Sequence, residues 1–333
     1  MDTKNYVSLY LICLFFLITA CESAVMREYN THMSGNDYRS ARQLLESELS
    51  SNPNSTEANY LMGNLLSLEK EYEEANIYFE QSLNASSMYR EHIEYLKERN
   101  YRREFNEGLN AWDQERLQQT LQQMNYASQI FPDRVEVYPI LGNAYEAIGQ
   151  PDDAQQAYLN CLAFQEDNFQ CGSNLAQSYY DDGQYIRAID TSNEFLNYYP
   201  SNANFKKISA YSHLEIGDID TAEEMFDSFL GVRNNYEALK QFAVDLNNMG
   251  EIYRAERYFR RCLEWMPRDQ DVLSALSYIY LETRNFRLMV EANERLVSLE
   301  PENRLLKENL MLSYELYGDI DNYKAIKSEL GLD

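Results

Sequence analysis

Residues 135–165 read VEVYPILGNAYEAIGQPDDAQQAYLNCLAFQ, and the order of apolar and turn residues in this stretch decides the fold. Four residues recur at the spacing of one helical face: Tyr138, Leu141, Gly142 and Tyr145. A turn follows at residues 149–151, Gly-Gln-Pro. A second helical face then holds Ala154, Tyr158 and Cys161. The stretch therefore predicts two short amphipathic helices joined by a tight turn.

The same pattern recurs along the chain with a period near 34 residues. The small position of the second helix holds Ala41, Ala75, Ala154, Ala188, Ala222 and Ala255. The long interval after Ala75 contains one degenerate repeat, with Thr120 at this position, and an insertion of 11 residues. Turn glycines and closing prolines keep the same register, so we count nine frames.

This pattern resembles the tetratricopeptide (TPR) signature, W-x2-L-G-x2-Y…A-x3-F, with Tyr in two of the aromatic positions. The resemblance implies an all-α solenoid of about nine helix-turn-helix repeats, forming a right-handed superhelix over residues 21–333. We expect the insertion, near residues 88–100, to lengthen a first helix and to protrude past the end of the solenoid. Its basic run, interleaved with glutamates, fits either a solvated mixed-charge helix or a docking knob. The last frame is expected to be a polar cap.

The N-terminus has a targeting pattern. A lysine precedes an apolar run over residues 6–19, which is too short for a comfortable membrane span. The run ends Leu-Ile-Thr-Ala-Cys at residues 17–21, which resembles the lipobox of bacterial lipoproteins. The resemblance implies a signal peptide over residues 1–20, lipidation of Cys21 and a lipid anchor in the bacterial cell envelope, with the outer membrane preferred. An ordinary secretory signal peptide is the alternative.

The composition excludes several classes of function. The chain has 333 residues, 29 Lys plus Arg and 54 Asp plus Glu, for a net charge of −25. Nucleic acid is therefore not an expected partner, because phosphate binding needs a cationic surface. The sequence has no CxxC, HExxH, Gly-rich phosphate loop or local Ser/His/Asp arrangement. The acid pairs at residues 152–153 and 181–182 are assigned to the starts of second helices. We expect no enzyme, no metal and no cofactor.

Three cysteines lie beyond the N-terminal segment: Cys161, Cys171 and Cys262. Cys161 and Cys262 occupy the same small position of a second helix, which predicts buried core thiols. Cys161 and Cys171 are ten residues apart, and an oxidising compartment would allow a disulfide between them. The sequence leaves both interpretations open.

The TPR resemblance also implies where a partner binds, because first helices line the concave groove of such proteins. Carried over to this chain, the groove positions hold Tyr60, Asn64, Phe105, Trp112, Glu136, Asn143, Glu146, Asn174, Gln177, Tyr180, Tyr211, Glu237, Asn247 and Tyr278. Amides can bond to a peptide backbone, tyrosines offer flat contact area, and acids favour a basic partner. An ordinary solvated helix face fits the same residues equally well.

The expected function is a non-catalytic protein–protein interaction scaffold or docking lipoprotein at the envelope, which binds a partner segment in the groove. The alternative is a carbohydrate- or peptidoglycan-associated accessory subunit of an envelope hydrolase. Phe105 and Trp112 favour that alternative, since sugars stack on aromatic rings.

Overall fold

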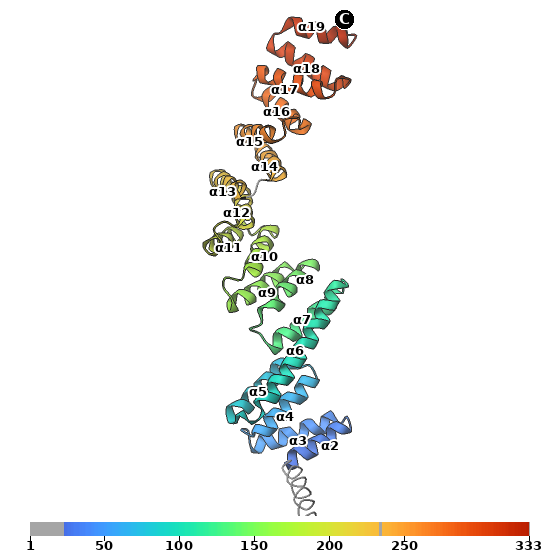
Figure 1. Cartoon of the computed structure of the whole chain (residues 1–333), viewed down its shortest axis with the longest axis vertical. Coiled ribbons are helices and arrows are strands. Elements are labelled where there is room, and N and C mark those ends of the chain that lie inside the picture. Colours follow the sequence, from blue (N-terminus) through green and yellow to red (C-terminus); the bar gives the residue numbers. More distant parts are fainter. Residues whose placement is uncertain (1–22, 233–234, 333) are drawn as a thin grey trace, which may run out of the picture. The chain divides into compact units, whose positions relative to one another are not determined.

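The computed structural model describes residues 23–232 and 235–332, where every regular element is helical (Figure 1). The chain divides into two compact units, with the boundary between Glu223 and Glu224. The first unit contains α2 (Ala24–Ser34), α3 (Tyr38–Ser51), α4 (Thr56–Leu68), α5 (Tyr72–Ala85), η1 (Ser87–Tyr89), α6 (Arg90–Asp113), α7 (Leu117–Ile130), η2 (Val135–Val137), α8 (Tyr138–Ala147), α9 (Pro151–Phe164), α10 (Phe169–Asp181), α11 (Tyr185–Tyr198) and α12 (Ala203–Glu215). The boundary falls within α13 (Ile219–Val232).

The second unit continues with α14 (Tyr236–Asn248), α15 (Ile252–Trp265), α16 (Gln270–Glu282), α17 (Phe286–Leu299), α18 (Arg304–Tyr317) and α19 (Ile320–Glu329). Over the described ranges, 18 α-helices pack as successive antiparallel pairs, as in a TPR solenoid. The predicted fold class is therefore confirmed. We call the helices of each pair the first helix and the second helix.

One residue with positive φ separates the two helices of every pair, because the chain must leave the first helix in a left-handed conformation. These residues are Asn36, Lys70, Glu115, Gly149, Gly183, Gly217, Gly250, Arg284 and Gly318, with φ between 55° and 86°. Five are glycines, which adopt this conformation without steric cost. The other four show that the repeat register continues where the glycine signal is missing from the sequence.

The small positions of the second helices are buried, as the repeat pattern predicts. Ala154 and Thr120 are both fully buried. Gly142 shows why some positions are small, since a Cβ there would lie 2.2 Å from Cε1 of the buried Tyr158 ring. Stacked pairs thus bury apolar faces that a single pair would leave in water.

The insertion lies within α6, which has 24 residues against 13 or 14 in most other helices. The prediction that this insertion protrudes is wrong, because Ile93 and Leu96 are buried in the same cluster as Leu61 of α4. The outer side contains ion pairs one turn apart, such as Glu98 with Arg102. A mixed-charge helix packed on the preceding repeat therefore describes the insertion.

A buried carboxylate ties the second repeat to the third. Glu104 has no exposed side-chain area and accepts hydrogen bonds from the Tyr72 hydroxyl at 2.7 Å, Lys70 Nζ at 3.0 Å and Arg103 at 2.7 Å. Burial raises the pKa of Glu104, but these three donors outweigh it and hold the pKa below its ordinary value. The ion cluster is consequently a stabilising contact between repeats.

Cys161 of α9 and Cys171 of α10 form a disulfide with a Cα–Cα distance of 6.3 Å, and both are fully buried. Cys161 is thus not a free thiol. Cys262 is free and buried, as the small second-helix position predicts. The bond connects two successive repeats across one interhelical turn.

The expected polar cap at the end of the array is only partly right. No residue of α19 is buried, Lys324 is exposed and Lys327 is half-buried. However, Leu305 is 64% exposed and Ile320 is 62% exposed, so the last pair also presents apolar side chains. The proposed lipidation site Cys21 and the signal peptide lie outside the described residues.

Candidate binding face

An acidic hollow opens among α8, α9 and α10 of the first unit, with a volume of about 270 Å³. It is lined by Glu146, Pro151, Ser178, Asp181 and Asp182. Three of these five side chains are carboxylates, and none of the five is cationic. The hollow therefore offers a concentrated negative charge beside two successive first helices.

A half-buried amide contact joins those first helices. Asn143 Oδ1 accepts hydrogen bonds from the Tyr158 hydroxyl at 2.8 Å and from Asn174 Nδ2 at 2.9 Å. Since Asn143 lies in α8 and Asn174 in α10, one oxygen joins two repeats. This contact, with the close approach of Tyr158 to Gly142, holds Glu146 opposite the end of α10.

Charge is costly at one acid of the hollow, Glu146. Burial raises the pKa of Glu146, the charge of Asp181 raises it further, and hydrogen bonds from Ser178 and Tyr158 oppose the shift. Asp181 is the last residue of α10, next to the negative end of the helix dipole. Its carboxylate accepts only an amide donor, Gln177 Nε2 at 2.8 Å, among the hydrogen bonds of the described residues. A cation entering the hollow would stabilise the charged form of Glu146 and offset its repulsion by Asp181.

Two family models described as tetratricopeptide repeat match residues 28–88 and 135–168. These two stretches are tetratricopeptide repeats. No curated protein matches the sequence of the chain.

Several solved structures are similar to this chain. A tetratricopeptide repeat protein from Parabacteroides merdae is 20% identical, covers 70% of this chain and 98% of its own, and has a TM-score of 0.48. MamA is 17% identical over 50% of this chain and 91% of its own, with a TM-score of 0.46. Pseudomonas aeruginosa pilF is 17% identical over 67% of this chain and 98% of its own, with a TM-score of 0.44.

The structure brings four of the predicted groove residues together around the hollow: Asn143, Glu146, Asn174 and Gln177. Only Glu146 lines the hollow itself. The two asparagines bond to each other and Gln177 bonds to Asp181, so these amides position the acids.

Other predicted groove residues serve packing between repeats. Glu136 accepts a hydrogen bond from the Tyr101 hydroxyl at 2.7 Å, and Tyr60 stacks on Tyr89 with ring centroids 4.3 Å apart. Asn64, Tyr180 and Tyr211 are half-buried. These side chains thus already make contacts within the protein, which leaves less of their surface for a ligand.

The two rings that favoured a sugar ligand are also half-buried. Phe105 stacks on Tyr101 with centroids 5.5 Å apart, and Trp112 packs against the same core cluster. A sugar-stacking platform needs an open ring face, and both rings are partly covered by this packing.

The second unit holds the remaining predicted residues. Glu237 and Tyr278 are exposed, the latter by 57%. Asn247 is half-buried, and its Oδ1 atom has no hydrogen-bond partner in the described part of the chain. None of these three residues lines the acidic hollow.

Sequence reasoning missed Ser178, Asp181 and Asp182. The assignment of the last two to the start of a second helix is wrong, because α10 ends at Asp181 and α11 begins at Tyr185. The glycine at residue 183 was the available signal: acids directly before a turn glycine belong to the end of a first helix.

Among the described residues, no group of three His, Cys, Asp or Glu side chains is placed to hold a metal ion. In the same ranges, each helix is too short or too polar to cross a bilayer.

Proposed function

We propose that this TPR protein is a non-catalytic docking protein whose acidic hollow binds a lysine- or arginine-bearing segment of a partner protein. The observation behind the proposal is the hollow itself, with three carboxylates and no lining cation. A partner ammonium or guanidinium group would pair with Glu146 and Asp181 and restore the ordinary pKa of Glu146. Electrostatic complementarity of this kind sets specificity and the association rate.

The proposal includes an address in the bacterial envelope, with Cys21 lipidated and the outer membrane preferred. Its support is the apolar run that ends in Leu-Ile-Thr-Ala-Cys. Acyl chains contribute about 0.8 kcal/mol per buried methylene, so two or more would anchor the repeats stably. Confinement to a membrane would also raise the effective concentration toward a partner in the same layer.

The anchor is tested by labelling cells with an alkyne fatty acid and fractionating their membranes. The wild-type chain should incorporate label and pellet with outer membranes, whereas Cys21→Ser should do neither. Cleavage of the wild type without label would instead support an ordinary secretory signal peptide.

The hollow is tested by in-cell crosslinking followed by mass spectrometry. Glu146→Lys with Asp181→Lys reverses the hollow, and Glu166→Lys with Asp167→Lys applies the same charge change to exposed acids of the next loop. The hollow variant should recover the partner at least tenfold less than wild type, while the loop variant should match wild type. Equal recovery with both variants would contradict the proposal, and recovery of glycan alone would favour the carbohydrate alternative.

A further inference from the structure

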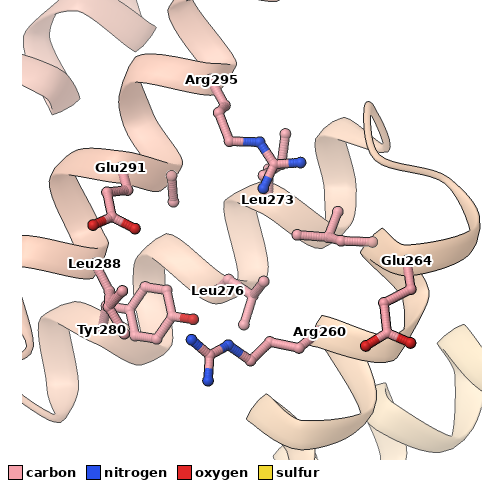
Figure 2. A pocket seen from close by; sticks show the side chains of 10 residues that line it. Arg260, Glu264, Leu273, Leu276, Tyr280, Leu288, Glu291 and Arg295 are labelled. Carbon is pink, nitrogen blue, oxygen red and sulfur yellow. The ribbon is translucent and has the colours of Figure 1, made fainter.

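A second cavity, of about 300 Å³, lies in the second unit among α15, α16 and α17 (Figure 2). We call it the leucine groove. Its apolar lining includes Leu263, Leu273, Leu276 and Leu288. Its volume is at the lower end of the ~300–1,000 Å³ range of ligand clefts, which suits a few side chains of a larger partner.

The leucine groove lies on a different kind of face from the acidic hollow. The helices α15 and α17 are the second helices of consecutive repeats, and the first helix α16 contributes residues between them. The acidic hollow is instead formed beside the ends of two first helices. The two sites therefore use different helices of the repeat.

Arginines from both second helices reach the leucine groove. Figure 2 shows Arg260 beside Tyr280 and Arg295 near Leu273. Arg260 is paired loosely with Glu256 at 3.5 Å and keeps 55% of its side chain exposed, while Arg295 donates to the Pro267 carbonyl. Guanidinium groups have five donors each, so both retain capacity for a carboxylate.

The local charge contrasts with that of the whole chain. Together α15 and α17 contain six arginines and four glutamates, whereas the chain has a net charge of −25. Glu264 and Glu291 also line the groove, but Glu291 is paired with Arg287 at 2.6 Å. An acidic partner repelled by most of this protein would find a favourable potential here.

We propose that the leucine groove binds an acidic amphipathic segment of a partner protein. One or two apolar side chains of that segment contact Leu263 and Leu288, the two partly exposed leucines of the lining, and its carboxylates pair with Arg260 and Arg295. This site is independent of the proposed function, because its ligand has the opposite charge and it uses the other helix of each repeat.

The test is selection from a random twelve-residue peptide display library on the full purified chain. Selected peptides should have net negative charge and contain Leu, Ile or Phe. Their affinity should fall at least tenfold for Arg260→Glu with Arg295→Glu, and less than twofold for Arg268→Glu with Arg284→Glu, which are exposed arginines outside the groove. Peptides with Lys in place of Glu should regain binding to the groove variant.

Several results would overturn the proposal. These are no enrichment, enrichment of basic or neutral peptides, or equal binding to the groove variant and wild type. Sedimentation showing a wild-type dimer that the groove variant loses would assign the groove to a second copy. Flotation with phosphatidylglycerol vesicles, lost in the same variant, would assign it to lipid. The Glu146→Lys, Asp181→Lys variant should bind the selected peptides like wild type. Failure of the leucine-groove proposal can therefore be distinguished from failure of the acidic-hollow proposal.

Discussion

Replacing Gly142 with alanine should destabilise the first unit, because its new methyl group would meet the Tyr158 ring. A Cβ there lies 2.2 Å from Cε1, against 3.4 Å for an ordinary contact. The ring must move by more than 1 Å, which strains its hydrogen bond to Asn143. Overpacking costs about 1–3 kcal/mol, and removing a helical glycine returns about 1 kcal/mol. Because the overlap is large and the ring is fully buried, we expect a net loss of about 2 kcal/mol.

Gly231 supplies a matched control with the opposite sign. It also lies in a helix, but a Cβ there has no atom within 4 Å. Gly231→Ala should therefore stabilise the chain by about 0.5 kcal/mol. Equilibrium urea unfolding followed by circular dichroism measures both variants, and hydrogen exchange of α8 and α9 amides localises the effect of the first.

A third variant isolates the ring contact. In a Tyr158→Leu background, the added methyl group at residue 142 should cost less than 1 kcal/mol, since the atoms it meets are gone. If Gly142→Ala were as stable as Gly231→Ala, or if its cost persisted in the leucine background, close approach to the ring would not explain the glycine.

Three further outcomes follow from the first unit. Glu104→Gln should lose about 2 kcal/mol at pH 7, because buried donors lose a charged acceptor. The folded-state pKa of Glu104 is lowered, so its contribution to the free energy of unfolding is complete above the unfolded pKa of 4.5 and falls as the pH drops through the folded pKa. Thermal unfolding between about pH 3 and 6 should therefore show less acid sensitivity in the variant than in the wild type. Reduction should cost about 3 kcal/mol in the wild type and nothing in Cys161→Ala, Cys171→Ala, as judged by melting with and without dithiothreitol. Ile93→Ala should cost at least about 2 kcal/mol and Tyr95→Ala less than about 0.5 kcal/mol in urea unfolding, because only the former side chain is buried.

The repeat architecture could be predicted from sequence because each structural position has a local chemical requirement. A buried small residue in the first seven second helices fixed the period even where Thr120 replaced alanine. The turn positions were harder, since Lys70, Glu115 and Arg284 have positive φ without being glycine. Such residues accept backbone strain that the packed helices on either side compensate. Sequence alone therefore showed the five glycine turns and left these three, together with Asn36, unmarked.

The packing of α6 could not be predicted from helix propensity. The sequence correctly indicated a long charged helix. Whether that helix protrudes or packs on the preceding repeat depends on tertiary contacts. Ile93 and Leu96 lie on one side at a helical spacing of three residues and bury that side against the second repeat. The same two residues were visible in the sequence, and their burial needed the partner surface to be known.

The candidate site was predicted from the sequence only in part, for a related reason. Carried-over groove positions identified Glu146 and the amides around it, since these lie within the regular part of a first helix. The remaining acids depend on where α10 stops, and helix ends are set by cap geometry rather than by period. An error of a few residues in that boundary moved Asp181 from one helix to the next.

Charge compensation separates structural acids from candidate binding acids in this protein. Glu104 is bonded to Lys70 and Arg103, and Asp269 is bonded to Lys240 at 3.1 Å, so both contacts between repeats are neutralised by cations. At the hollow, Asp181 receives an amide donor and Glu146 hydroxyl donors, which orient a carboxylate without cancelling its charge. The hollow thus keeps the net charge that the repeat contacts remove. A basic partner would supply the missing cation, which is why we place binding at the hollow rather than at the more numerous acids between repeats.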